Sequence, residues 1–254
     1  MKIPPLNKYP PVKQVGDQER VGMVKEIFAT VTDRYDFLNR FLSLRRDVYW
    51  RKFAVRKMVF FRTHRFLDIA CGTGDLSILA CLRHKSIRAV GVDFVHPMLK
   101  KALLKKEKNR LGQTLNFIQG NALMLPFGEN MFDVTAMAFG IRNIPQKTEA
   151  IKEMLRVTVP GGQIMILEMN FIQNRFFKCF YRVYLNHLLP LLAGVFSKNA
   201  AAYYYLADSI MNFPAPSEFA AFLKETGIDN VQIYPLTLGM TCLFVGKKST
   251  HPLG

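Results

Sequence analysis

The sequence lacks several features by which common classes of protein are recognised. Its 254 residues include only four cysteines, and these form no CxxC pair. A disulfide scaffold is therefore excluded, no zinc or other metal site is indicated, and the cysteines are expected to be reduced thiols. The N-terminal segment has no apolar run typical of a secretory signal, and no segment has the roughly 18 consecutive apolar residues of a membrane-spanning helix. We expect a soluble chain or one that lies on a membrane surface.

Acidic residues are scarce relative to basic ones. The chain carries 35 Lys and Arg against 19 Asp and Glu, which gives a formal net charge of +16. Such an excess attracts an anionic partner, whether nucleic acid, an acidic membrane surface or a phosphate-bearing ligand, and does not by itself distinguish them. Hydrophobic residues make up 50% and charged residues 21%, which is typical of a folded globular chain.

The middle of the chain alternates short apolar runs with helix-length segments. The predicted strands are residues 65–70, 88–93, 115–119, 131–138 and 162–169, and the predicted helices are residues 75–83, 97–110 and 146–157. A helix over residues 217–226 and a closing hairpin of two strands, residues 231–235 and 240–246, follow. Met98, Ala102 and Leu103 are expected on the inner face of the second helix. Strands separated by helices predict a parallel α/β sheet.

Two segments rich in Phe, Tyr, Leu and basic residues lie outside this alternation and are predicted to be helical. Because ligands of open α/β sheets bind at the carboxyl ends of the strands, we expect these additions to cover that edge as a lid. The predicted organisation is a flexible arm (1–19), a single domain (20–248) with an N-terminal helical lid (20–60) and a helical insertion (174–213), and a short tail (249–254).

The most informative motif is LDIACGTGD at residues 67–75, where a buried strand meets a glycine-containing turn and then a helix. Gly72 and Gly74 permit a positive φ and allow a ligand to approach the backbone closely. The start of the following helix presents unpaired N–H groups that favour a carboxylate or a phosphate. Ser77 stands where the dinucleotide fingerprint GxGxxG has its third glycine, so this is not the NAD motif.

Polar residues also end the next two predicted strands. Asp93 follows the glycine turn by about twenty residues, the spacing at which a carboxylate accepts hydrogen bonds from ribose hydroxyls. A helix cap is the alternative for a lone aspartate, and the upstream turn favours the ribose. Asn121, in the segment QGNA, offers an amide to the edge of an adenine. The short turn leaves no marked room for a pyrophosphate, so the three signals together predict S-adenosylmethionine.

At this point the chain resembles the UbiE/MenG family of quinone-biosynthesis C-methyltransferases, in the family's order, from about Gly22 to Lys248. The segments that carry the resemblance are IFATVTDRYDFLNRFLSLRRDVYWRK, LDIACGTGD, VGVD, QGNALMLPF, FDVTAMAFGIRNI, EMLRVTVPGGQIMILEM, YYYLADSI and LTLGMTCLFVGKK. The glycine motif alone indicates only a class I methyltransferase. FGIRN, together with RYDFLN and YYYLADSI, is much more specific.

The resemblance implies a class I S-adenosylmethionine-dependent methyltransferase fold, which is Rossmann-like, with a mostly parallel seven-stranded sheet, an antiparallel edge strand and helical lid additions. It implies methylation of a ring carbon of a reduced polyprenyl quinone, either a demethylmenaquinol or a methoxy-polyprenyl-benzoquinol. It also implies that Thr73, Asp93, Asn121 and Ala122 contact the cofactor.

Two positions differ from the residue that is common in the family, and a third carries one of the two residues that the family uses there. Cys71 and Arg45 stand where glycine is common in the family, and Ala138 takes the place of a serine or alanine near the cofactor. We interpret Cys71 as a steric variation and not as a nucleophile, and Arg45 as a change in the local shape of the lid.

Carbon methylation needs a ring with phenolate character, so we sought groups that stabilise an oxyanion. Arg142 and Asn143, in the FGIRN segment, are predicted to lie at the carboxyl edge of the sheet and to be catalytic. A guanidinium is too basic to act as a direct base, so Arg142 is predicted to stabilise the phenolate or to orient a water. Its alternative role is a surface salt bridge. Tyr35, His187 and Tyr203 are weaker candidates.

The predicted partners are the polyprenyl quinol and an anionic membrane. Basic residues at 45–52 and 100–106 are candidates for contact with lipid, although the second group also suits a solvated helix face. Residues 176–196 are a candidate cover for the prenyl tail. No nucleic acid is predicted, because the fourth strand does not end in an NPPY-like tetrad. The predicted location is the cytoplasm, peripheral on the inner face of the membrane. A homodimer and another lipid or small phenolic acceptor stay open.

Overall fold

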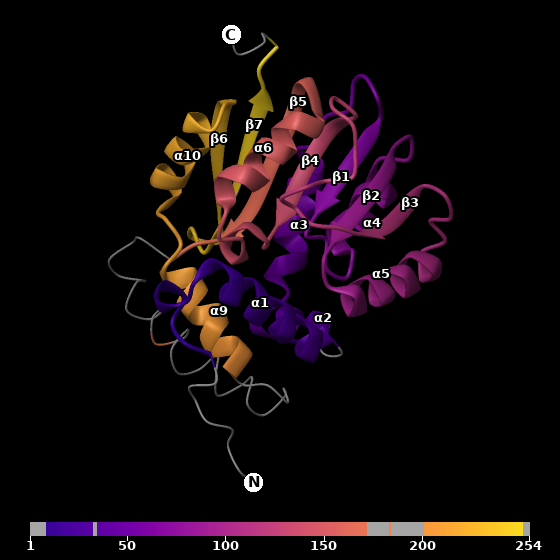
Figure 1. Ribbon diagram of the computed structural model, residues 1–254. Helices are drawn as coiled ribbons and strands as arrows, with labels where there is room; N and C mark the ends of the chain where they lie inside the picture. Colours follow the sequence, from indigo (N-terminus) through magenta and orange to yellow (C-terminus); the bar gives the residue numbers. More distant parts are fainter. Residues whose placement is uncertain (1–8, 33–34, 172–182, 184–200, 251–254) are drawn as a thin grey trace.

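One seven-stranded sheet forms the centre of the protein (Figure 1). The computed structural model describes residues 9–32, 35–171, 183 and 201–250. The strands are β1 (Arg65–Ile69), β2 (Arg88–Asp93), β3 (Leu115–Gln119), β4 (Phe132–Ala138), β5 (Thr158–Met169), β6 (Ile228–Leu236) and β7 (Thr241–Lys248). They lie in the order β3-β2-β1-β4-β5-β7-β6.

The pairing of the strands confirms the predicted fold class. The pairs β1–β2, β1–β4, β2–β3 and β4–β5 are parallel, whereas β7 is antiparallel to both β5 and β6. Six strands therefore run in one direction and β7 runs against them. The antiparallel strand stands one place inside the sheet, with β6 as the outermost strand.

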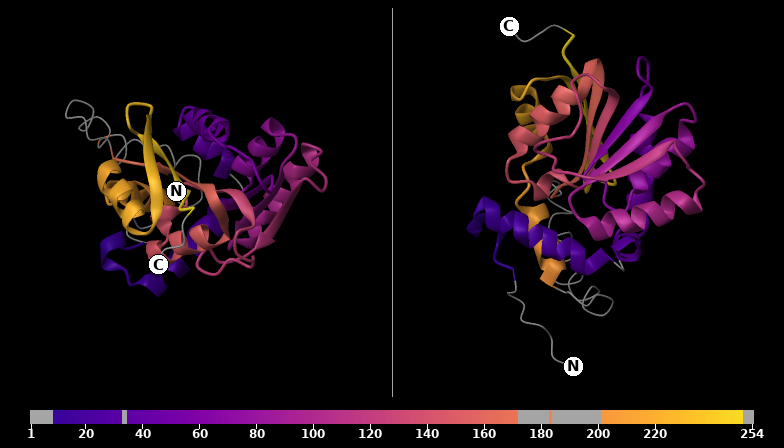
Figure 2. Two further views of the ribbon diagram at one scale, coloured as in Figure 1. Left: turned by 90° about the horizontal axis from the view of Figure 1, so that it is seen from above. Right: turned by 45° about the vertical axis from the view of Figure 1, so that its right-hand side comes forward.

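Helices cover both faces of the sheet in three layers (Figure 2). On one face, α3 (Arg46–Arg56) and α4 (Asp75–Arg83) pack in a core with side chains such as Phe66, and α5 (His96–Lys108) packs against β3. On the other face, α6 (Lys147–Val157) and α10 (Pro216–Glu225) pack in a second core with Leu67. Because Phe66 and Leu67 are consecutive, β1 is buried on both sides, as expected for a central parallel strand.

A third group of helices lies beyond the carboxyl ends of the strands. It consists of the 3-10 helix η1 (Val12–Gln14), α1 (Asp17–Val31), α2 (Tyr35–Leu42) and α9 (Ala201–Met211), which share their own apolar cluster. Figure 1 shows α1, α2 and α9 side by side below the sheet. We call this group the lid cluster. Of the predicted helical insertion, Val183, α9 and the two residues after it fall among the described residues, and the rest, including His187, lies outside them.

Two details differ from the sequence-based predictions. The predicted N-terminal lid includes α3, yet Trp50 of α3 is buried in the core on the sheet face, so this helix is a flank of the sheet. Leu103, predicted on the inner face of α5, is 42% exposed, and Leu99 is buried in its place. The helical rotation of 100° per residue groups Leu99 with Met98 and Ala102 and turns Leu103 outward.

Strand β5 is longer than predicted because the Pro160–Gly162 turn lies within it. Phe132 pairs with Thr158, and Val134, only two residues on, pairs with Gln163. The extra residues form a bulge at which Gly161 has a φ of +77°. None of the helices in the described ranges is long and apolar enough to span a membrane.

Candidate active site

The turn between β1 and α4 has two glycines with different requirements. Both have a positive φ, +55° at Gly72 and +78° at Gly74. A Cβ at Gly74 would lie 2.5 Å from the Phe117 ring, so Gly74 permits the close packing of α4 against β3. A Cβ at Gly72 would meet nothing within 4 Å, because Gly72 borders an open pocket. The turn thus presents bare backbone to the pocket, and its contact with a cofactor stays a prediction.

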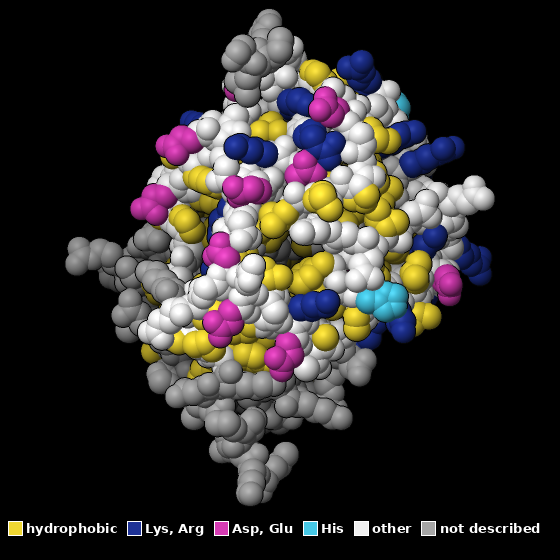
Figure 3. All heavy atoms as spheres, viewed as in Figure 1, with side chains coloured by type: hydrophobic (Ala, Val, Ile, Leu, Met, Phe, Trp, Pro, Cys, Tyr) yellow, Lys and Arg dark blue, Asp and Glu magenta, His cyan; other side chains and the backbone are white. Residues whose placement is uncertain are grey.

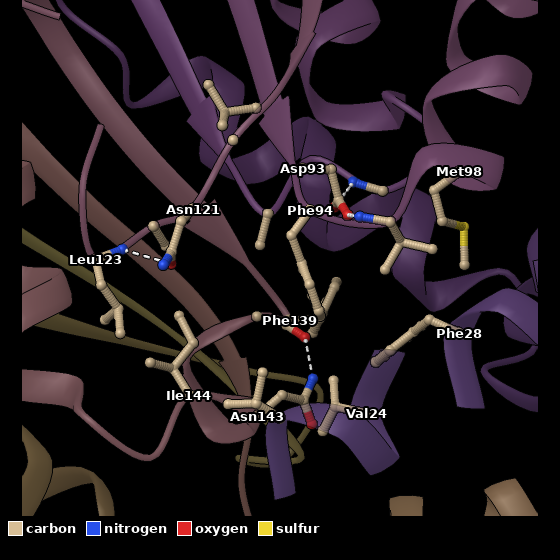
Figure 4. A pocket seen from close by; sticks show the side chains of 18 of the residues that line it. Val24, Phe28, Asp93, Phe94, Met98, Asn121, Leu123, Phe139, Asn143 and Ile144 are labelled. Atoms are coloured by element: carbon tan, nitrogen blue, oxygen red, sulfur yellow. Dashed lines mark hydrogen bonds between the residues drawn. The ribbon is translucent and has the colours of Figure 1, made fainter. Parts of the chain in front are cut away.

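That pocket lies between the carboxyl ends of the strands and the lid cluster and has an empty volume of about 890 Å³. Figure 4 shows Asp93 and Asn121 along one wall, with Val24 and Phe28 of α1 opposite. The other lining residues are Val21, Tyr35, Ala70, Gly72, Val92, Phe94, Val95, Met98, Gly120, Ala122, Leu123, Ala138, Phe139, Gly140, Asn143, Ile144, Pro145 and Gln146. The pocket therefore brings together five of the eight predicted site residues.

Asp93 fastens the glycine turn to the end of β2. Its Oδ2 accepts a hydrogen bond from the Gly72 N–H (2.7 Å), and its Oδ1 accepts one from the Val95 N–H (2.8 Å). Burial raises the pKa of Asp93 against the lowering effect of these backbone donors. The N-cap residue of α5 is Val95, so Asp93 is not its cap. The carboxylate retains acceptor capacity that suits a ribose hydroxyl.

Asn121 has one half of its amide already engaged. Its Oδ1 accepts a hydrogen bond from the Leu123 N–H (3.0 Å), within a turn that an isolated bridge between Asn121 and Met124 closes. This contact directs the carbonyl into the turn and leaves the NH₂ group to donate. Such a donor suits a ring nitrogen of adenine. Ala122, next in the chain, lines the pocket beside it.

Thr73 faces the lid cluster instead of lining the pocket. Its hydroxyl donates to Asp36 Oδ1 of α2 (2.6 Å) and accepts from Lys105 Nζ of α5 (3.1 Å). Lys105 also donates to Asp36 Oδ2 (3.0 Å) and to Asp75. We call Asp36, Thr73, Asp75 and Lys105 the α2 clamp. Asp36 and Lys105 were missed by the sequence analysis, although Asp36 stands inside RYDFLN. The cofactor contact of Thr73 stays a prediction.

Charge within the α2 clamp is balanced by cations. Burial alone would raise the pKa of Asp75, yet the nearby Arg51, Lys105 and Arg40 hold it below its usual value. Arg51 is itself buried in an ion pair with Asp47 (2.8 Å). The clamp therefore joins α2 to the glycine turn through charges that are partly withdrawn from water.

Arg142 is buried behind the pocket. It belongs to the 3-10 turn η3 (Ile141–Asn143), is 5% exposed, and pairs with Glu168, which is fully buried at the end of β5. Its Nη1 also donates to the Phe139 carbonyl (2.9 Å). Arg142 does form a salt bridge, but the alternative that placed it at the surface is wrong, because the pair is buried. Sequence analysis missed Glu168, whose signal is a single acid in the apolar strand ILEM. The catalytic role of Arg142 stays a prediction.

Asn143, the neighbouring residue of η3, does line the pocket. Its Nδ2 donates to the Phe139 carbonyl (3.4 Å), and its Oδ1 accepts from the Tyr205 hydroxyl of α9 (3.1 Å). Phe139 has a φ of +60°, which turns its carbonyl toward both η3 side chains. Tyr35 also lines the pocket, and burial raises its pKa. Tyr203 is buried in the lid cluster and is not among the pocket-lining residues.

The residues that depart from the resemblance have simple structural accounts. Burial holds the pKa of Cys71 well above its usual range, so its thiol stays protonated and is a poor nucleophile. Arg45 has a φ of +61°, a left-handed conformation that explains why glycine suits this position. Among the described residues, no group of three or more His, Cys, Asp and Glu could hold a metal ion.

A mostly parallel sheet in this order, a bare glycine turn and a carboxylate at the end of β2 define a class I S-adenosylmethionine-dependent methyltransferase. The chain matches the ubiE/COQ5 methyltransferase family over residues 13–248. It belongs to that family, which confirms the resemblance seen in the motifs.

Individual relatives agree with this assignment. The chain is 37% identical to the ubiquinone/menaquinone biosynthesis C-methyltransferase UbiE of Geotalea daltonii, over 91% of this chain and 98% of that protein. It is 38% identical to the demethylmenaquinone methyltransferase of Deinococcus radiodurans, over 92% and 96%. A solved S-adenosylmethionine-dependent methyltransferase from Thermotoga maritima, with 18% identity, superposes with a TM-score of 0.61 over 88% of this chain and 99% of that one.

Proposed function

We propose that the protein methylates a ring carbon of a reduced polyprenyl quinone, either a demethylmenaquinol or a methoxy-polyprenyl-benzoquinol. The observation that carries the proposal is the two-sided pocket. Polar groups suited to S-adenosylmethionine line one wall, and apolar side chains of α1 and the segment after η3 line the other. The curated relatives are named for the same chemistry.

The residues of the sheet wall fit the cofactor. Gly72 offers open backbone, Asp93 offers carboxylate oxygens to the ribose, and Asn121 offers its NH₂ group to the adenine. When bound, S-adenosylmethionine supplies a methyl group on a sulfonium sulfur, and transfer to carbon leaves the electron pair of the C–S bond on sulfur. The ring carbon contributes the electron pair of the new bond, and its proton is then released to restore aromaticity.

The lid wall is suited to the acceptor. Val24, Phe28 and Ile144 give it apolar surfaces that exclude water from a quinol ring and the start of its tail. Asn143 faces the same space with an N–H donor. The Arg142 cation is paired with Glu168 behind the pocket, so it acts on the acceptor through the η3 turn that it holds in place. These residues would orient the ring and stabilise its phenolate form.

The direct test uses membranes from a strain that lacks its own quinone C-methylase. The protein is incubated with these membranes and labelled S-adenosylmethionine, and the labelled lipid is identified by mass spectrometry. We expect the label on a quinone ring, and the species identified distinguishes the menaquinone from the ubiquinone precursor. Label on a phospholipid or on an added simple phenol would instead support the alternative acceptors. A protein that binds S-adenosylmethionine and labels no quinone contradicts the proposal.

We further propose that the protein works at the cytoplasmic face of an anionic membrane and meets it through α2 and the turn after it. Phe37, Phe41 and Leu44 there are 54%, 40% and 83% exposed, and Arg45 and Arg46 beside them are also exposed. Tyr35 of the same helix lines the pocket, so this surface adjoins the pocket.

Charge alone does not choose this face of the protein. Figure 3 shows Lys and Arg side chains spread over the upper part and the right-hand side of the molecule, down to the level of the lid cluster. The net charge of +16 therefore gives a general attraction to anionic lipid, and the exposed apolar side chains decide the orientation.

Sedimentation with vesicles of phosphatidylglycerol and phosphatidylcholine tests this contact. We expect salt-sensitive binding that Leu44→Glu weakens several-fold, whereas Val59→Glu, at an exposed position in the loop before β1, has less effect. Equal losses in the two variants would contradict the proposed face. Sedimentation without vesicles shows whether the protein also forms a homodimer.

A further inference from the structure

The η3 turn is held from three directions. Glu168 of β5 pairs with the Arg142 side chain, and its Oε2 also accepts from the Arg142 backbone N–H (3.2 Å). Arg20 of α1 donates from Nη2 to the Arg142 carbonyl (2.6 Å). Tyr205 of α9 donates to Asn143 Oδ1. Of the three residues that make these contacts, only Tyr205 reaches a side chain that lines the pocket.

The orientation of the Asn143 amide follows from its two partners. The Phe139 carbonyl can only accept, so the Asn143 NH₂ group must face it. The Arg20 guanidinium, which can only donate, also interacts with the Tyr205 hydroxyl, so the hydroxyl hydrogen is left for Asn143 Oδ1. An amide turned by 180° would set two acceptors against each other at Phe139.

The Tyr205 hydroxyl keeps its proton at neutral pH. Burial raises its pKa, and the opposing effect of the Arg20 and Arg142 cations does not overcome that increase. A protonated hydroxyl is a constant donor to Asn143. Among the described residues, the second hydrogen of Asn143 Nδ2 has no acceptor, and the side chain borders the pocket.

We propose that Tyr205 is a positioning residue that fixes the Asn143 carboxamide as a hydrogen-bond donor to a ring oxygen of the methyl acceptor. The inference rests on the proposed function in that the acceptor carries such an oxygen. The donor is worth most when that oxygen is deprotonated, because charge-assisted hydrogen bonds are the strong ones. The lid cluster thus completes the acceptor side of the pocket through one hydroxyl group.

Tyr205→Phe removes that hydroxyl and retains the ring. With a short-tailed quinol we expect kcat to fall about five- to tenfold, the scale of one lost hydrogen bond, while S-adenosylmethionine affinity stays within about twofold. Tyr204→Phe, on the same helix and without a described contact to η3, is the matched control and should keep its activity. In an Asn143→Ala background, Tyr205→Phe should have no further effect. Wild-type turnover in Tyr205→Phe, or equal losses in both backgrounds, would overturn the positioning role.

A binding measurement separates this inference from the proposed function. Affinities for 1-naphthol and for naphthalene, which has no hydroxyl, are measured with S-adenosylhomocysteine present. Tyr205→Phe should weaken binding of 1-naphthol several-fold and leave naphthalene unchanged. If the wild-type protein methylates no quinol and this difference persists, the proposed function fails and the positioning role stands. If the variant binds both compounds as the wild type does, the positioning role fails whatever the substrate.

Discussion

The two walls of the pocket are held in place by different kinds of contact. On the sheet wall, Asp93 binds the N–H groups of Gly72 and Val95, 21 and two residues away in the chain. Asn121 binds the N–H of Leu123, also two residues away. These bonds join side chains to the backbone at the ends of strands that the sheet already aligns.

The lid wall depends on side chains that are distant in the sequence. Thr73 and Asp36 are 37 residues apart, Asn143 and Tyr205 are 62 apart, and Arg20 and Arg142 are 122 apart. Each of these contacts forms only when a helix of the lid cluster is docked. The comparison indicates that the sheet wall is built with the sheet, whereas the lid wall is assembled when the lid cluster docks.

The largest effect is expected behind the pocket, at Glu168. Glu168→Ala leaves the Arg142 cation buried and unpaired, so we expect a loss of about 3–5 kcal/mol in the free energy of unfolding. Replacing both partners, as Glu168→Ala with Arg142→Met, should recover much of that loss. Urea denaturation of the wild type, the single variant and the double variant measures these free energies of unfolding. A single variant as stable as the wild type would mean that the pair does not hold η3.

The next largest effect tests the sheet wall alone. Asp93→Ala removes the carboxylate that accepts from the Gly72 N–H and that we propose binds the ribose, and a hydrogen bond to a charged group contributes about 1.5–3 kcal/mol. S-adenosylmethionine binding should weaken by that amount in isothermal titration calorimetry. Asp93→Asn, which keeps one acceptor, should lose less. If a folded Asp93→Ala binds the cofactor as tightly as the wild type, the ribose assignment is wrong.

The difference between the walls also explains what the sequence could predict. The glycine turn, Asp93 and Asn121 were found because local spacing fixes their place at the strand ends. Strand and helix positions followed from apolar periodicity, apart from local errors such as Leu103 and the bulge in β5. The family resemblance identified Arg142 as a candidate. Its burial was not predicted, because hydrophobic periodicity does not show which side chains of a loop are covered.

The residues that the sequence analysis missed belong to pairs. Asp36 and Lys105 form part of the α2 clamp, and Glu168 and Tyr205 hold η3. A lone acid or tyrosine has several ordinary explanations, and its partner lies on another element. Such pairs become visible only when the helices of the lid cluster and the sheet are placed in space.

A smaller effect is expected from breaking the α2 clamp. Asp36→Ala removes an acceptor that Thr73 and Lys105 share, and the unfolding free energy should fall by about 1 kcal/mol, which is roughly 2–4 °C in Tm. Hydrogen exchange should increase over α2 and stay unchanged in β2. The control is Arg40→Ala on the same helix, whose ion pair with Asp75 is longer (3.6 Å) and more exposed. If Asp36→Ala increased hydrogen exchange as much in β2 as in α2, the two walls would not be independent.

The smallest effect has the opposite sign and concerns the turn between α2 and α3. Arg45 has a φ of +61°, which costs an L-residue about 1–2 kcal/mol. Glycine has no such strain. It does, however, increase the conformational entropy of the unfolded chain, which lowers stability by about 0.5–1 kcal/mol. Arg45→Gly should therefore stabilise the protein by about 0.5–1 kcal/mol, measured as a higher Tm. The same substitution at the exposed Lys52, inside α3, should destabilise it by about 1 kcal/mol, because glycine is a poor helix former. A loss of stability in both variants would mean that the Arg45 side chain holds the lid in place and that its backbone strain is offset there.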